Sequence, residues 1–319
     1  MIRLILVPLD CSPFAEQALP LAQSIAKRAD ATLQLVHVHR PMALEYPEHR
    51  LISEDALTTE LKTRQRDYLD KLASRLSAAG TKLADPLILQ GDVAESIHQL
   101  VAKQKVDLVV GTSHGRGPAA RMWLGSVADR LIRELHSPLI LIRPSESAAR
   151  VESEMVFKHV LVPLDGTNLA EGIIEPALLF DKFMDVEFTL MRVIKPIVPM
   201  HYPSPNTSSS TFLQGEFVQQ LETAETESRR KALEYLDDIA ERLRERLVRV
   251  HTEVVDDEHP AAAIIEAARR IPADLIAMQT HGRHGVARLL LGSVADKVLR
   301  SSTIPLLVQR PAIGLTHSS

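Results

Sequence analysis

Short apolar runs alternate along the chain with longer segments in which apolar residues recur at helical spacing. In the first half, the short runs cover residues 4–7, 33–38, 87–89, 108–110 and 139–142. The periodic segments between them predict helices that start after Ser12-Pro13, run from Leu57 to Leu76, include Ile97 and span Val127 to Leu135. Uninterrupted apolar strands that alternate with helices are typical of a parallel sheet covered on both faces. We therefore expect a doubly wound α/β fold with five strands in this half.

The second half of the chain repeats the motifs of the first. The sequence VPLD at residues 7–10 recurs at 162–165, and LGSVAD at 124–129 recurs at 291–296. The first motif repeats after 155 residues and the second after 167, so the second copy holds 12 extra residues. We expect these extra residues in a proline- and serine-rich loop at 196–215.

A repeat of this length is a duplicated domain rather than a short solenoid unit. We expect one α/β domain at residues 1–145 and a second at 155–311, joined by a short polar segment. Each copy forms its own five-stranded parallel sheet with helices on both faces. Two such domains can pack as an internal pseudo-dimer in place of a two-fold homodimer. The sequence leaves open whether the chain also forms a further homodimer.

The composition narrows the range of partners. A net charge of −4 and an aromatic content of 4% argue against a nucleic-acid surface, which needs basic and stacking residues. The single cysteine, Cys11, excludes an internal disulfide. Because no run of about 18 apolar residues occurs, we expect no transmembrane helix and no membrane partner. The first apolar run is too short for a signal peptide, so we expect a cytoplasmic protein.

Candidate chemistry lies where strands end and helices begin. Ligands of open parallel sheets sit beyond the carboxyl ends of the strands, where Asp10 ends its strand. Gly125-Ser126 opens the last helix of the first copy, and a helix start offers free N–H groups and a positive dipole to a phosphate. The same residues, followed by Asp129, also fit an ordinary serine cap with an acid three positions on. Both interpretations stay open at this point.

The whole pattern resembles the universal stress protein family in its tandem two-domain form. The resemblance rests on VPLD, on His37-Val38 after the second strand, and on the sequence HGR followed by LGSVAD, found twice. It implies that the fifth strands of the two copies meet, because this edge is a dimer surface in the family. It also implies an adenine nucleotide, ATP or a relative. Asp10 and Asp165 would face the adenine, Val38 and Val193 would line its pocket, and the ribose and phosphates would lie against Gly115, Gly125, Ser126, Gly282, Gly292 and Ser293.

One position departs from the family pattern in both copies. Nucleotide-binding members carry Gly-x2-Gly-x9-Gly-(Ser/Thr), and the first glycine is Thr112 in the first copy and Gln279 in the second. A side chain at this position can crowd the ribose or the phosphates, or exclude a backbone conformation open only to glycine. Because threonine is smaller than glutamine, we expect the first copy to be the better nucleotide site.

Three functions remain after these observations. The first is a stress protein that binds ATP or a related adenine nucleotide as a regulatory ligand. The second is a scaffold of the same family that has lost nucleotide binding. The third is a slow ATPase, which ranks last because no Walker A loop and no matched base and nucleophile are apparent, so we assign no catalytic residues.

Other residues allow weaker predictions. Cys11 is either a redox thiol beside the pocket or, more often for a lone cysteine, a space-filling side chain. His37 and His39 share a strand face but lack an evident third ligand, so we expect no metal there. His114 and His281 either contact phosphate or shuttle protons or, more often for loop histidines, bond to the backbone. The charged segment 222–249 predicts a helix with an apolar stripe that ends at Leu247.

Overall fold

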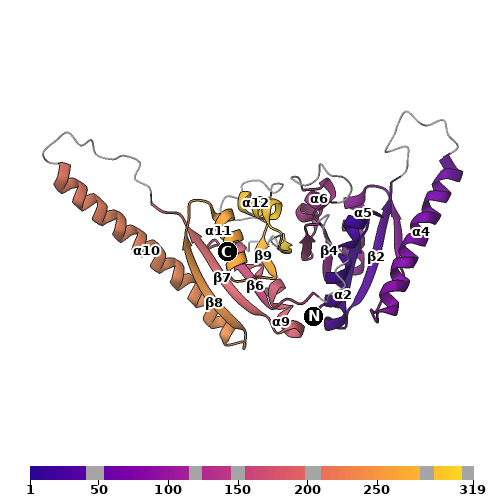
Figure 1. The fold of residues 1–319 in the computed structure, drawn as a ribbon, viewed down its shortest axis with the longest axis horizontal. Coiled ribbons are helices and arrows are strands. Elements are labelled where there is room, and N and C mark those ends of the chain that lie inside the picture. The colour runs from indigo at the N-terminus through magenta and orange to yellow at the C-terminus, as the bar shows by residue number, and fades with distance from the viewer. Residues whose placement is uncertain (41–53, 115–123, 145–154, 198–209, 281–290, 311–319) are drawn as a thin grey trace, which may run out of the picture.

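The computed structural model describes residues 1–40, 54–114, 124–144, 155–197, 210–280 and 291–310 (Figure 1). The elements of the first half follow the predicted alternation: β1 (Leu4–Pro8), α1 (Pro13–Glu16), α2 (Leu19–Ala29), β2 (Thr32–His39), α4 (Glu54–Ala78), β3 (Leu87–Gln90), α5 (Val93–Gln104), β4 (Leu108–Thr112), α6 (Ser126–Glu134) and β5 (Leu139–Ile142). The second half consists of β6 (His159–Pro163), α7 (Asn168–Glu171), α8 (Ile174–Leu178), α9 (Asp181–Met184), β7 (Glu187–Ile194), α10 (Ser210–Arg244), β8 (Arg249–Asp256), α11 (Pro260–Arg270), β9 (Leu275–Gln279), α12 (Ser293–Ser301) and β10 (Leu306–Gln309).

The strands of both halves form one ten-stranded sheet in the order β3-β2-β1-β4-β5-β10-β9-β6-β7-β8. Among the strands that the structure describes, neighbours are parallel within each half, and β5 and β10 pair antiparallel between the halves. The predicted pair of five-stranded parallel sheets is therefore confirmed, and the two join edge to edge along the fifth strands. At this seam Ile140 pairs with Leu307, its own counterpart in the repeat. The antiparallel pairing is thus centred on equivalent residues, as a two-fold axis between the halves requires.

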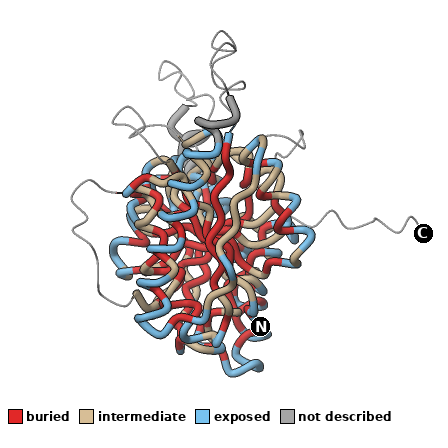
Figure 2. Tube along the Cα trace, turned by 90° about the vertical axis from the view of Figure 1, so that its right-hand side faces the viewer, coloured by how far each residue is buried: buried red, intermediate tan, exposed pale blue. Residues whose placement is uncertain are grey.

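Helices cover both faces of the sheet, because successive side chains of a strand point to opposite faces. On β2, Leu33 and Leu35 belong to the core under α2 and α4, whereas Val36 and Val38 belong to the core under α5 and α6. Each of the two cores contains buried residues from both halves. Figure 1 shows α4 and α10 on opposite outer flanks and α6 and α12 near the middle. Figure 2 shows the buried residues concentrated along the centre of the molecule.

Two arginines join the halves on either side of the seam. Arg143, which follows β5, donates from Nη1 to the carbonyl oxygen of Arg300 at 2.9 Å. Arg310, which follows β10, donates from Nη1 to the carbonyl oxygen of Arg133 at 3.0 Å. Both acceptors lie in the last turn of a helix, α12 or α6, where free carbonyl groups favour a cation. The two contacts are equivalent under the repeat, so the halves bind each other reciprocally.

Two local predictions were wrong. The first predicted helix is split into α1 and α2, with Pro20 in the first turn of α2. The segment 210–215, expected within a loop, is helical, and α10 has 35 residues against 25 in α4. Most of the 12 extra residues of the second copy therefore lengthen a helix, while residues 198–209 of the expected loop lie outside the described part.

The apolar stripe of α10 also ends earlier than expected. Leu236, Ile239 and Leu243 are buried against the sheet, but the helix ends at Arg244. Leu247 lies beyond the end of the helix, has a positive φ of 63° and is 92% exposed. Among the described residues, no helix combines the length and apolar character needed to cross a membrane.

Candidate functional site

The aspartates that follow the first strands are held in tight turns. Oδ1 of Asp10 accepts a hydrogen bond from the backbone N–H of Ser12 at 3.0 Å. Oδ1 of Asp165 accepts from the N–H of Thr167 at 3.0 Å and from its hydroxyl at 2.6 Å. Ser12 and Thr167 then cap α1 and α7, so each carboxylate is fixed between a strand end and a helix start.

The sheet register brings the other predicted residues to the same edge. Pro8 pairs with Val36 in the parallel β1–β2 ladder, so Asp10 and Val38 lie at the same level two residues further on. The second copy pairs Pro163 with Met191, which places Asp165 level with Val193 in the same way. Val38 is buried and Val193 is half-buried, as expected of residues that line a pocket wall.

A backbone hydrogen bond joins the end of β4 to the start of α6. The N–H of Gly125 donates to the carbonyl oxygen of Ser113 at 2.8 Å, and Gly292 donates to Thr280 at 2.7 Å in the second copy. A Cβ on Gly125 would lie 3.2 Å from Ser113 O and 3.3 Å from His114 Cα. Glycine therefore suits this close approach of two backbone segments by its lack of a side chain; its φ of −62° is open to any residue. These bonds hold the start of the last helix beside the end of the fourth strand in each copy.

The predicted serine cap is not observed in either copy. Gly125 and Gly292 are the N-cap residues, neither makes a side-chain cap bond, and Ser126 and Ser293 are the first helical residues. Both serines are exposed. Asp129, three residues after Ser126, is paired with an arginine one turn later in the helix: its Oδ1 accepts from Nη2 of Arg133 at 2.8 Å.

The second copy repeats this arrangement, since Asp296 accepts from Nε of Arg300 at 2.8 Å. These ion pairs reduce the repulsion that each aspartate would exert on an anion at the helix start. The helix start of each copy thus has neither a side-chain cap nor an uncompensated acid in its first turn.

The two residues that replace the first motif glycine differ in how they fit. Gln279 is buried, and its amide bonds to the backbone N–H of Ile173 at 3.1 Å and to the carbonyl oxygen of Gln309. It shares its sheet face with Leu275 and Ala277, opposite the face that α12 covers. The side chain of Gln279 therefore extends away from α12.

Gly172, which lies beside Gln279, also differs from its counterpart in the first copy. A Cβ on Gly172 would lie 2.7 Å from the end of the Gln279 side-chain amide, so the glutamine side chain would have to move to admit it. In the first copy the equivalent positions hold Gln17 and the half-buried Thr112. In each copy one of these two positions holds glutamine and the other a smaller residue, but the glutamine is at the first position in copy one and at the second in copy two. This relation is visible in the sequence once the two repeats are aligned.

Some predicted residues lie outside the described part of the chain. Gly115 and Gly282, expected to contact ribose and phosphates, belong to segments 115–123 and 281–290, which the structure does not describe.

Comparisons with known proteins agree with this architecture. The sequence profile of the Universal stress protein family matches residues 1–143 and 156–310. The chain belongs to the universal stress protein family. A universal stress protein of Mycolicibacterium smegmatis is 26% identical over 96% of this chain and 97% of its own length, and one of Thermus aquaticus is 30% identical over 45% of this chain and all of its own length. The crystal structure of a universal stress protein from Archaeoglobus fulgidus has the same fold, with a TM-score of 0.63, 19% identity and 97% coverage of both chains.

A tyrosine near the end of each first strand was not anticipated from the sequence. The Tyr68 hydroxyl of this universal stress protein donates to Oε1 of Glu16 at 3.1 Å, and Arg75 bonds to the other oxygen at 3.3 Å. Burial raises the pKa of Tyr68, and the charges of Glu16, Cys11 and Asp10 raise it further, so the hydroxyl stays protonated. Glu16 lies on α1, which Ser12 caps, and the N–H of Ser12 donates to Asp10, so this tyrosine is linked to the candidate site.

The second copy holds the counterpart, Tyr235. Burial raises its pKa, as do Glu171 and Asp165. The guanidinium of Arg192 lies over its ring, 5.1 Å from the centroid, and Arg242 bonds to Glu171 at 3.4 Å. The repeat of tyrosine, glutamate and arginine at matching positions is the signal that could have identified this cluster.

The cysteine and the strand histidines form local contacts. Nδ1 of His37 lies 2.8 Å from Leu9 O and 3.6 Å from Sγ of Cys11. Because a carbonyl oxygen only accepts, Nδ1 carries a proton and donates to Leu9. Nδ1 of His39 instead bonds to Oε1 of Gln65 at 3.0 Å. The two rings thus serve separate hydrogen bonds.

His114 lies at the mouth of the β4–α6 loop, where its Nδ1 is 3.0 Å from the hydroxyl of Ser113. Burial lowers the pKa of His114, and the positive charge of Arg143 lowers it further. The ring is therefore neutral at pH 7. This contact is to a side-chain hydroxyl, and it tests none of the roles predicted for this histidine. His281 lies outside the described residues.

Proposed function

We propose that each copy binds an adenine nucleotide, ATP in the first place, as a regulatory ligand. The observation that carries this proposal is the glycine-capped start of α6 and of α12, which lies beside the end of β4 or β9 with an exposed serine in its first turn. Free backbone N–H groups at a helix start favour phosphate oxygens. Membership of the universal stress protein family supports this proposal, and with it a cytoplasmic location.

The residues divide into two groups in this proposal. Asp10 and Val38, or Asp165 and Val193, face the base at the ends of the first two strands. The phosphates lie against Gly125 and Ser126, or Gly292 and Ser293, with Gly115 and Gly282 completing the motif. Because the side chain of Gln279 extends away from α12, it is compatible with nucleotide in the second copy. We retain the order of affinity expected from side-chain size, with the first copy tighter.

Isothermal titration calorimetry on the full chain, freed of copurified nucleotide, tests this proposal with ATP, ADP and AMP. We expect two sites for ATP. Gly125→Ala places a Cβ 3.2 Å from Ser113 O, so the helix start or the Ser113–His114 backbone must give way by a few tenths of an ångström. We expect the first site to weaken at least tenfold while the second remains. Gly111→Ala is the matched control, since a Cβ there meets no atom within 4 Å. Absence of binding at millimolar ATP would refute the proposal.

A second candidate function is a scaffold that binds no nucleotide. Thr112 and Gln279 favour it, because both copies lack the first motif glycine. The substitution Thr112→Gly discriminates between the candidates. If the wild-type chain binds no ATP and the variant does, nucleotide binding has been lost at this position. If both bind ATP with similar affinity, the scaffold function is excluded.

A further inference from the structure

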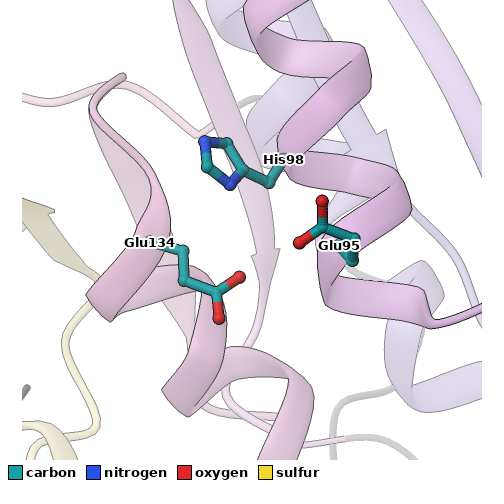
Figure 3. Close-up of side chains that lie close together, drawn as sticks. All are labelled: Glu95, His98 and Glu134. Atoms are coloured by element: carbon teal, nitrogen blue, oxygen red, sulfur yellow. The ribbon is translucent and has the colours of Figure 1, made fainter.

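Three side chains with metal-binding atoms converge between α5 and α6 of the first copy (Figure 3). Glu95 and His98 lie one turn apart on α5, and Glu134 is the last residue of α6. One carboxylate oxygen of each glutamate and one ring nitrogen of His98 all lie within 4.8 Å of one another. This cluster lies on the sheet face that α5 and α6 cover and uses none of the residues of the proposed nucleotide site.

The two oxygens of Glu134 differ in their surroundings. Oε1 accepts from Nε of Arg130 at 3.2 Å, and the same guanidinium bonds to Asp92 at 2.6 Å. Oε2 is shielded from solvent and has no hydrogen-bond partner among the residues that the structure describes. A buried carboxylate oxygen without a partner is costly. The arginine therefore stabilises one oxygen of Glu134 and leaves the other available to a ligand.

The second copy shows that the packing of the two helices does not require these polar groups. Helices α11 and α12 pack against each other as α5 and α6 do. The positions equivalent to Glu95, His98 and Glu134 hold Ala262, Ile265 and Ser301. Ile265 packs partly buried against the core. The fold thus accepts apolar or small residues at all three positions, and the three metal-binding side chains occur together in the first copy alone.

We propose that Glu95, His98 and Glu134 bind a divalent first-row transition metal, with Zn²⁺ as the representative ion. An imidazole nitrogen with two carboxylate oxygens suits such ions, whereas Mg²⁺ and Ca²⁺ prefer oxygen ligands alone. Three protein ligands leave a coordination position for water or another molecule. Glu95 is exposed and its Oε1 accepts from Nε2 of Gln99 at 2.6 Å, while its carboxylate already lies within 4.8 Å of the other two ligands.

Zinc titration of the full chain, stripped of metal with a chelator, tests this proposal by calorimetry. We expect one tight equivalent of Zn²⁺ and no comparable binding of Mg²⁺. His98→Ala and Glu134→Gln should each weaken binding at least tenfold, because loss of a ligand costs no less than the 10–100-fold typical of a supporting residue. Far-ultraviolet circular dichroism and thermal unfolding without metal verify that both variants remain folded.

His259→Ala is the matched control. His259 is exposed, occupies the position in the second copy equivalent to Asp92, and lies 3.8 Å from a carboxylate oxygen of Asp257. Its loss should leave zinc binding unchanged. Visible absorption of bound Co²⁺ should likewise change in His98→Ala and not in His259→Ala. If the wild-type chain binds no zinc at 100-fold excess, or if folded His98→Ala binds as well as wild type, the proposal is overturned.

Discussion

The seam between the halves makes a quantitative prediction for Leu307. This side chain is fully buried, pairs across the seam with Ile140, and belongs to a core shared by both halves. Leu307→Ala removes most of its apolar contacts and leaves a cavity. Buried leucine-to-alanine substitutions cost about 2–5 kcal/mol. We expect about 3 kcal/mol here, because the site is close-packed from both halves and cannot collapse easily.

Urea unfolding followed by circular dichroism measures this loss through the shift of the midpoint at constant slope. Leu247→Ala is the control, since Leu247 is 92% exposed and its loss should change stability by less than about 0.5 kcal/mol. Ile140→Ala should cost a similar amount to Leu307→Ala. The double variant should lose less than the sum by about 0.5 kcal/mol or more, because the two side chains are direct neighbours.

The reasoning about the seam would be refuted by a loss below about 1 kcal/mol for Leu307→Ala. Strict additivity of the two substitutions would separately contradict the cross-seam contact. Either result would mean that the halves are held together elsewhere.

Three further predictions concern contacts around the site. Arg143→Ala and Arg310→Ala each remove a half-buried hydrogen bond to a carbonyl group at a helix end. Each should lower the free energy of unfolding by about 1 kcal/mol in the same urea assay. A clear difference between the two losses would contradict the reciprocal contact. Because burial and Arg143 lower the pKa of His114, the unfolded chain binds this proton more readily, so the residue reduces stability as pH falls below about 6.5. In an NMR titration Arg143→Gln should raise the pKa of His114, and no change would exclude the influence of Arg143. Cys11 has φ of 62° where the second copy has Gly166 with φ of 86°, so Gly166→Ala should destabilise the chain by about 1 kcal/mol and Cys11→Gly should not, as thermal unfolding can show.

The sequence alone predicted the alternation of strands and helices, the duplication and the residues at the strand ends. These features depend on local patterns: apolar periodicity, proline and glycine positions, and repeated motifs. The elements of each copy are predictable from the sequence because the apolar face of a strand or helix is set by local residue spacing, whichever element packs against it. The meeting of the fifth strands came from the family resemblance and was confirmed by the β5–β10 pairing.

The tertiary structure decided the features that depend on which atoms are brought together across long separations. Gly125 rather than Ser126 is the N-cap of α6, where its N–H bonds to Ser113 O and a Cβ would be tightly placed against the Ser113–His114 backbone. Gln279 extends away from α12 because of its place on β9, and on that face its amide finds partners in Ile173 and Gln309 beside Gly172. A sequence pattern specifies which face of a strand or helix a residue occupies. It does not specify the hydrogen-bond partners of that residue, which depend on segments far away in the sequence.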